Sequence, residues 1–336
     1  MAASCLKPVN GFPFRGMYGG IGQILTFHRV IPESNRQRIW SNSYLEVTTG
    51  YLEKVIRYYK SNNFEFLSLD DLVSKGFNMS RKFVIFTFDD GFRDNLTFAL
   101  PILRKYNVPL NIYITTDFID KKTILWWNIV EDVILQNDEL TFEWFGEKIH
   151  FQCTSPTEKN NTFGRIHSLI QEGTHLTIYD RALMFCQIFK VDPFSSITEL
   201  ALSWNEVRQL CNDKLVTLGA HTVSHPVLSR LSDEGALGEI GQSKRRIEQE
   251  TGKEVKHFAY PFGGKKEASL REYEMARQCG FDTAVTLVSA SVLREHQNMM
   301  YQLPRIAVGM SMDEVTFDLL RFGVIQMMRN DGKPLT

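Results

Sequence analysis

Apolar residues follow two alternating patterns along the chain. Short, mostly apolar runs recur, as in Phe83–Phe88, and such runs are typical of strands buried on both faces of a parallel sheet. Between these runs, apolar residues recur at helical spacing, as at Leu52, Val55, Ile56 and Tyr59. The alternation predicts an α/β fold with a parallel sheet and helical crossovers. The expected strands cover residues 23–27, 64–67, 83–88, 110–114, 215–220, 255–260, 283–287 and 303–306.

The alternation is interrupted over residues 121–203. Trp126–Trp127 begins an apolar helical pattern, apolar and polar residues then alternate on both sides of Gly146 as in a hairpin, and helical stretches follow near 163–172 and 177–190. We therefore expect a distorted (β/α) barrel of seven or eight units that carries a mainly helical insertion. The expected units are residues 1–120 and 204–336 for the two parts of the barrel and 121–203 for the insertion.

Local signals predict where several helices begin and end. Asp94 is expected to cap a helix that ends near Asn107. A glycine is expected to close a long helix over about 233–252. A last helix is expected over about 311–328.

Two pairs of adjacent acids follow apolar runs. Asp70–Asp71 is followed at once by apolar residues, so these acids are expected to favour the positive end of a helix that begins near Asp70. Asp89–Asp90–Gly91 directly follows a buried run, with no helical pattern until Asp94. A buried carboxylate needs a cation, a metal or hydrogen-bond donors, and ligands gather at the carboxyl ends of parallel strands. We therefore interpret Asp89 and Asp90 as site residues.

Two histidines four positions apart follow another apolar run. His221 and His225 come after residues 215–220, and their imidazoles converge on one point if the backbone between them makes about one helical turn. Two imidazoles and one carboxylate form an open site for a divalent metal, with positions left for water and substrate. The histidine pair and one of the two adjacent acids are therefore candidate metal ligands.

Composition excludes several classes of protein. The 38 basic and 39 acidic residues balance, so neither a nucleic-acid surface nor a polybasic membrane patch is expected. The five cysteines are scattered and odd in number, which favours reduced thiols over a disulfide framework. Residues 1–14 lack the pattern of a signal peptide, and no stretch approaches the length of a membrane span. We expect a protein that is cytoplasmic or peripheral to the inner membrane.

These motifs resemble those of the NodB-type polysaccharide deacetylases, carbohydrate esterases that remove N-acetyl groups from sugars. The resemblance covers nearly the whole chain apart from the insertion. Thr87–Gly91 resembles the first motif, which implies Asp89 as the general base and Asp90 as a metal ligand. His221–His225 resembles the second motif, which implies both histidines as the other ligands. The resemblance also implies one divalent ion, Zn²⁺ in the first place, with Co²⁺, Ni²⁺ or Fe²⁺ as alternatives.

The segment Tyr260–Pro261–Phe262–Gly263 is similar to the third motif of the family. In the family this motif lines the substrate groove and offers a backbone N–H to the oxyanion. The resemblance therefore implies substrate contacts for Tyr260, Pro261 and Phe262, and the oxyanion role for the Tyr260 N–H.

Two features of the family are missing from this sequence. Residues 256–259 lack the arginine that usually braces the base, and the late strands carry no histidine for the general acid. Leu25–Val30 resembles the first strand of poly-N-acetylglucosamine deacetylases with a rearranged barrel, which implies His28 as the candidate acid. Arg305 is the candidate brace. From the residues alone, His28 is also consistent with a structural histidine, and Arg305 with a residue that braces a helix end.

The expected activity is metal-dependent hydrolysis of an N-acetyl group from an amino sugar, in a polysaccharide or in a lipid- or nucleotide-linked glycan precursor. A related amidase acting on a small amide or imide, and a carbohydrate-binding protein without catalysis, stay open as alternatives. A glycosidase is disfavoured because the adjacent Asp89 and Asp90 cannot flank one glycosidic bond from opposite faces. Trp126–Trp127 either packs the insertion onto the barrel or stacks on sugar rings.

Overall fold

The computed structural model describes residues 19–34, 36–171 and 177–329. The expectation about residues 1–14 and the first of the five cysteines, Cys5, lie outside these ranges. Within them, no helix is long and apolar enough to cross a bilayer.

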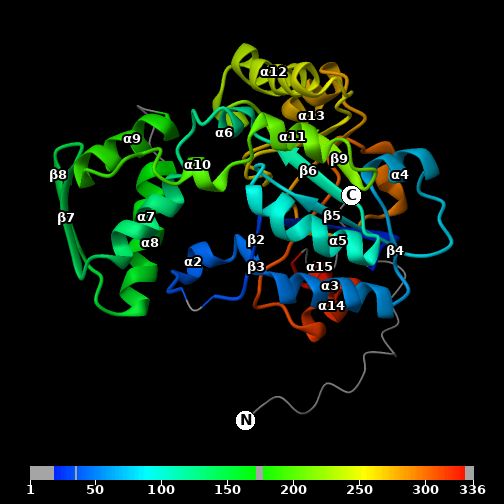
Figure 1. Ribbon diagram of the computed structural model, residues 1–336, viewed down its shortest axis with the longest axis horizontal. Coiled ribbons are helices and arrows are strands. Elements are labelled where there is room, and N and C mark those ends of the chain that lie inside the picture. Colours follow the sequence, from blue (N-terminus) through cyan, green and yellow to red (C-terminus); the bar gives the residue numbers. More distant parts are fainter. Residues whose placement is uncertain (1–18, 35, 172–176, 330–336) are drawn as a thin grey trace, which may run out of the picture.

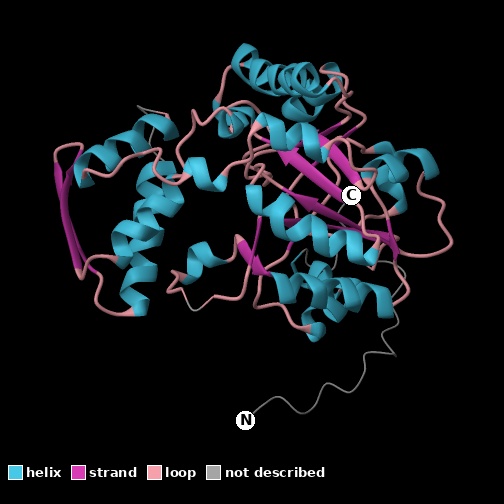
Figure 2. Cartoon of the chain, viewed as in Figure 1, coloured by secondary structure: helices cyan, strands magenta, loops and turns pink. Residues whose placement is uncertain are grey.

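A parallel sheet of eight strands forms the centre of the molecule (Figures 1 and 2). Its strand order is β11-β10-β9-β6-β5-β1-β12, and β4 pairs with the beginning of β5. Helices lie between consecutive strands, which confirms the predicted α/β fold. The strands are β1 (Gly22–Phe27), β4 (Glu65–Phe66), β5 (Phe83–Phe88), β6 (Leu110–Ile114), β9 (Val216–Ala220), β10 (His257–Ala259), β11 (Thr283–Val285) and β12 (Ile306–Ala307).

The sheet curls into a distorted barrel, as expected. Ile306 of β12 lies opposite Leu25 of β1, and Leu303, three residues earlier, forms a parallel bridge with Val285 of β11. Residues 303–307 therefore contact both β1 and β11 and bring the sheet toward closure.

All six residues of β5 are buried because its two faces pack against different partners. Val84, Phe86 and Phe88 belong to the main hydrophobic cluster, together with the apolar faces of the surrounding helices. Phe83 and Ile85 belong to a second cluster. The surrounding helices are α3 (Thr49–Ser61), α4 (Leu69–Lys75), α5 (Leu100–Tyr106), α6 (Thr116–Ile119), α11 (Trp204–Leu210), α12 (Asp233–Thr251), α13 (Leu270–Gln278), α14 (Glu314–Arg321) and α15 (Val324–Arg329).

The segment 121–203 packs around its own hydrophobic cluster at one side of the barrel (Figure 1). The expected hairpin is present, and Trp126 is buried in this cluster, which favours the packing alternative for that residue. Trp127 lies between this cluster and the main one. The elements are α7 (Trp126–Leu135), β7 (Glu139–Trp144), β8 (Glu147–Gln152), α8 (Pro156–Gln171), α9 (Ile178–Phe189) and α10 (Ile197–Leu200).

A small two-stranded sheet links the barrel to this segment. It consists of β2 (Arg29–Ile31) and β3 (Glu46–Thr48), and α2 (Trp40–Ser43) lies in the loop between them. The Ile39 carbonyl accepts the backbone hydrogen bonds that begin this short helix.

Two expectations about helix ends were wrong. The Asp94 side chain does not cap the next helix, because its carboxylate accepts from Arg29 Nε (2.9 Å) and the Val30 N–H (3.0 Å). The chain after Asp94 forms a π-helical turn, η1 (Asn95–Ala99), before α5. The expected last helix is divided into α14 and α15 because Gly323 adopts a left-handed conformation (φ 74°).

Candidate active site

Three candidate metal ligands from distant parts of the chain lie together at the carboxyl ends of the strands. Asp90 follows β5, and His221 and His225 follow β9. Asp90 Oδ1 lies 3.6 Å from the Nε2 atom of each histidine. Their ligand atoms all lie within 4.8 Å of one another, and among the described residues this is the one His, Cys, Asp or Glu group with that geometry.

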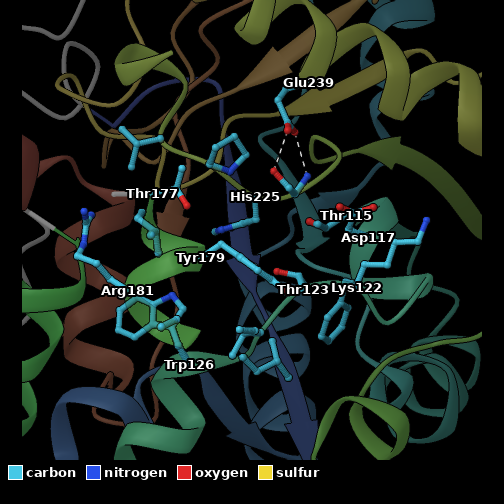
Figure 3. Close-up of a pocket in the computed structure, with 18 of the residues that line it drawn as sticks. Thr115, Asp117, Lys122, Thr123, Trp126, Thr177, Tyr179, Arg181, His225 and Glu239 are labelled. Atoms are coloured by element: carbon cyan, nitrogen blue, oxygen red, sulfur yellow. Dashed lines mark hydrogen bonds between the residues drawn. The ribbon is translucent and has the colours of Figure 1, made fainter. Parts of the chain in front are cut away.

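Left-handed backbone turns position these ligands. Asp90 and Gly91 have φ values of 74° and 94°, which turn the chain sharply away from β5. Thr222 and His225 are also left-handed (66° and 60°), so the two imidazoles converge without a helical turn between them. The carboxylate of Glu239 on α12 holds this loop by accepting from the Val223 N–H (2.9 Å) and from the N–H (2.9 Å) and hydroxyl (2.7 Å) of Ser224 (Figure 3).

The two histidines are in the protonation state that a divalent cation needs, whereas Asp90 would lose its proton to a bound ion. His221 Nδ1 lies 2.7 Å from the Ala259 carbonyl, so Nδ1 carries the proton and the Nε2 lone pair faces Asp90. Burial lowers the pKa of both histidines, which keeps them neutral. Burial and the neighbouring Asp89 raise the pKa of Asp90 to about 8.

Asp90 Oδ1 is buried and has no hydrogen-bond partner. An oxygen in that position costs free energy unless a cation or donor satisfies it. A carboxylate oxygen and two imidazole lone pairs match the ligand set of Zn²⁺ and of other divalent transition metals. Asp90, His221 and His225 therefore fit a metal ion.

A buried arginine holds the second carboxylate. Arg305 Nη1 and Nη2 lie 2.7 and 2.8 Å from the two oxygens of Asp89, a bidentate pair. Arg305 is only 1 % exposed, and its Nε donates to the Thr286 carbonyl (2.9 Å). Burial alone would raise the pKa of Asp89, but the guanidinium of Arg305 outweighs it and holds this pKa at about 2. Asp89 is therefore an anion at neutral pH.

His28 lies at the end of β1, close enough to Asp89 to interact with its charge. Asn95 Nδ2 donates to the His28 carbonyl (2.8 Å), and Asp94 accepts from the next two residues. Burial lowers the pKa of His28 to about 4; Asp89 opposes this effect, and Arg305 adds to it. The imidazole of His28 is therefore neutral at neutral pH. A histidine that protonates a leaving amine must first be in its imidazolium form.

The third sequence motif serves the structure differently from the expectation. The Tyr260 N–H donates to the Val285 carbonyl (3.2 Å). The Tyr260 side chain is buried in the main cluster, and its hydroxyl donates to the Tyr301 carbonyl (3.0 Å). The oxyanion role of this N–H stays a prediction that requires the N–H to share or release its bond to Val285. Phe262, after Pro261, places its ring 5.0 Å from the ring of His225.

Sequence reasoning missed several residues that shape the site. Glu239 on α12, Asn95 on η1 and Tyr44 directly after α2 belong to no motif. The Arg29 N–H donates to the Leu45 carbonyl (3.0 Å), which brings Tyr44 close to His28. Tyr44 is 57 % exposed, yet the protein around its hydroxyl and the charge of Asp90 raise its pKa. Long-range pairings of this kind leave no local signal in a sequence.

A cavity of about 1100 Å³ adjoins the metal ligands. Asp90 and His225 form part of its wall, residues 122–127 and the beginning of α9 form the opposite walls, and Trp127 places its ring 6.3 Å from that of His225. In the view of Figure 3, Trp126 and Arg181 lie on one side of His225. Asp117 and Lys122 lie on the other side.

Comparison with known proteins supports a family assignment. Residues 77–284, more than half of the chain, match the family described as polysaccharide deacetylase. A search of curated proteins finds no match.

Several solved structures share the fold. The deacetylase PplD of Streptococcus pyogenes, in complex with acetate, is 16% identical, with a TM-score of 0.56 over 89% of this chain and 97% of that one. A de-N-acetylase from Aggregatibacter actinomycetemcomitans is 14% identical, with a TM-score of 0.57 over 89% and 99%. IcaB from Ammonifex degensii is 15% identical, with a TM-score of 0.56 over 91% and 98%. At these identities the likeness shows the fold.

Proposed function

From the premise that the chain belongs to the polysaccharide deacetylase family and is a hydrolase acting on amide bonds of a carbohydrate, we propose that it removes N-acetyl groups from an amino sugar by metal-dependent hydrolysis. The proposed metal ligands are Asp90, His221 and His225, and Asp89 is the proposed general base. The observation that carries this proposal is the unsatisfied Oδ1 of Asp90 between two imidazole nitrogens, next to a carboxylate that Arg305 keeps ionised.

A divalent ion held by these ligands would polarise the acetyl carbonyl and lower the pKa of a water molecule. Asp89 would accept a proton from the attacking water, because it is ionised and Arg305 fixes its orientation. Its low pKa makes it a weak base, so it depends on a water that is already acidified.

His28 is the proposed general acid for the leaving amine. Because it is neutral at neutral pH, it must first take up a proton, and the negative charge that develops on the substrate favours this step. The contacts of Asp94 and Asn95 with residues 28–30 hold the imidazole in place for the transfer.

Two features disfavour the alternatives. The cavity is larger than a small amide or imide needs. The bidentate pair of Asp89 and Arg305 is intact, which a protein that only binds carbohydrate does not require.

The test is acetate release from N-acetylated sugars, namely polymers, lipid-linked sugars and nucleotide-linked sugars. We expect release that stops when a chelator removes the metal and returns with Zn²⁺, whereas Asp89→Asn should bind the metal and release no acetate. Release that continues without metal, or in Asp89→Asn, would contradict the mechanism.

A further inference from the structure

Tyr44 lies at the same edge of the sheet as the candidate metal ligands. It follows α2 directly, and the N–H of Arg29, the neighbour of His28, donates to the carbonyl of Leu45 (3.0 Å). On its other side Tyr44 faces Gly309, where an added Cβ atom would lie 3.9 Å from the Cβ of Tyr44. Tyr44 is therefore held between the segment that follows β1 and the segment that follows β12.

These two strands are neighbours of the strand that leads to Asp90. β1 pairs in parallel with both β5 and β12, and the Val308 N–H extends the pairing by donating to the Thr26 carbonyl (3.0 Å). Residues that follow parallel strands meet at one edge of the sheet, where ligands gather. The backbone of Tyr44 is therefore placed at the rim of the metal site, beside His28.

The hydroxyl of Tyr44 is available to a substrate. It forms no hydrogen bond with any residue in the described ranges, and Tyr44 is 57 % exposed. The protein around this hydroxyl and, to a smaller extent, the charge of Asp90 raise its pKa. The hydroxyl therefore keeps its proton at neutral pH and can donate a hydrogen bond without giving up that proton.

The reaction needs a donor that the third sequence motif does not supply in this structure. Addition of water to the acetyl carbonyl places negative charge on its oxygen, and donors aimed at that oxygen stabilise the transition state. The Tyr260 N–H, which was expected in this role, donates to the Val285 carbonyl (3.2 Å). The guanidinium of Arg305 is directed to Asp89. A donor from outside the motifs would fill this role.

Contacts with the segment 121–203 fix the helix that carries Tyr44. The buried carboxylate of Glu131 on α7 accepts from Asn42 Nδ2 (2.7 Å). Asn160 Oδ1 on α8 accepts from the N–H (2.9 Å) and the hydroxyl (2.7 Å) of Ser41. The backbone of α2 is therefore set before substrate binds, and a preorganised donor needs no rearrangement during the reaction.

We propose that the Tyr44 hydroxyl donates a hydrogen bond to the oxyanion that forms when water adds to the acetyl carbonyl, and that the segment 121–203 positions it through α2. This inference rests on the proposed function. The hydroxyl proton stays on the Tyr44 oxygen throughout. The oxyanion becomes the carbonyl of acetate when the C–N bond breaks, and the leaving nitrogen takes its proton from His28.

Kinetics of Tyr44→Phe on the Zn²⁺-loaded full chain give the first measurement. The substrate is the N-acetylated sugar with the fastest acetate release in the screen described above. We expect kcat to fall by about 10²-fold with KM nearly unchanged, because the bond strengthens only as charge develops. The matched control is Tyr106→Phe, which removes a surface hydroxyl that bonds to Arg57 (3.1 Å) and Glu53 (3.2 Å) and should leave kcat unchanged.

Binding of a tetrahedral analogue tests the contact without turnover. The probe is glucosamine that carries an N-methylphosphonyl group in place of the acetyl group, because this group is tetrahedral and anionic. Calorimetry on Tyr44→Phe should show affinity for this probe reduced by about 10²-fold and affinity for N-acetylglucosamine within about twofold of the unmodified protein.

Asn160→Ala tests the positioning by α2, because this variant removes the acceptor of Ser41 and leaves the site residues unchanged. We expect kcat and affinity for the phosphonyl probe to fall by about 3- to 10-fold. Neither should fall further when Asn160→Ala is added to Tyr44→Phe. Equal losses in both backgrounds would overturn the positioning role.

The outcomes separate the inference from the proposed function. Acetate release and probe affinity that are unchanged in Tyr44→Phe overturn the inference alone. Probe binding that depends on Tyr44, in a protein that releases no acetate from any sugar of the screen, supports the contact and overturns the deacetylase activity. A protein that neither releases acetate nor binds the probe overturns both.

Discussion

Asp89–Asp90 and Asp70–Asp71 are the same dipeptide in two regions of the molecule, and the structure gives each a histidine partner. His221 and His225, after the end of β9, face Asp90. At the other end of the barrel, His257 Nε2, from the first residue of β10, lies 3.2 Å from Asp70 Oδ1. Thr217, near the beginning of β9, donates to Asp70 Oδ2 (3.2 Å). Strand β9 therefore carries a partner of Asp70 near its beginning and is followed by the partners of Asp90 at its end.

Burial and partners distinguish the two pairs. The Asp70 side chain is 55% exposed and has hydrogen-bond partners, and the hydrogen bond from His257 lowers its pKa. Asp71 forms a capping box with Ser68 at the beginning of α4, as expected for acids in a first helical turn. Asp90 is 6% exposed, and its Oδ1 has no partner. A dipeptide therefore indicates chemistry only where the fold removes it from water and leaves an oxygen unsatisfied.

Asp90→Asn should have the largest effect among the variants that test the difference between the two acid pairs. We expect loss of the bound metal and a fall in activity of at least ~10³-fold, because the Lewis acid contributes several kcal/mol. The fold should persist, since an amide is less costly than a carboxylate in that buried position. Metal analysis and acetate release measure the result. The matched control is Asp70→Asn, which should keep both properties within about twofold and lose only about 1 kcal/mol of stability.

Arg305→Ala tests whether Arg305 keeps the Asp89 carboxylate ionised and oriented. Without the guanidinium, burial of Asp89 is no longer offset, so its pKa rises and the acid limb of the pH–rate profile moves to higher pH. We expect turnover to fall by up to ~10³-fold with metal still bound. Leaving a buried Asp89 unpaired also costs about 3–5 kcal/mol of stability. Arg305→Lys keeps the charge without the bidentate geometry, so its turnover should lie between those of the unmodified protein and Arg305→Ala. A pH–rate profile that moves in neither variant would contradict the role of Arg305.

His28→Ala separates proton delivery from metal binding. We expect kcat to fall by about 10²-fold, with the metal content and KM nearly unchanged, because general acids contribute at least this much. Steady-state kinetics with metal analysis provide the measurement. Unchanged turnover would leave His28 as a structural histidine.

The smallest expected effect concerns the second member of the exposed pair. Asp71→Ala should lower the free energy of unfolding by about 1 kcal/mol, because the capping box is lost, without any change in activity. Urea denaturation measures the change. Ser68→Ala should have a similar effect, and the double variant should lose little more than either one. Fully additive losses would show that the two side chains act independently.

The barrel strands and the approach of the two histidines could be predicted because their signals are local. An apolar run such as Phe83–Phe88 and the pair His221 and His225 each appear within a few positions of the sequence. The conformation between the histidines could not be predicted, because left-handed backbone at Thr222 has no residue-type signal. The Asp94 prediction failed because its true partner, Arg29, is 65 positions away. The ion pair of Arg38 with Glu131 depends on tertiary contacts in the same way.

The closing segment 303–307 has a consequence for how the enzyme becomes active as it is made. Arg305 lies 216 positions after Asp89, so a growing chain has already presented Asp90, His221 and His225 before the guanidinium leaves the ribosome. Closing such a long loop has a high entropic cost, which places the docking of this segment late in folding. A nascent molecule therefore presents the three candidate ligands first, and Asp89 lacks its ion pair until this segment delivers Arg305.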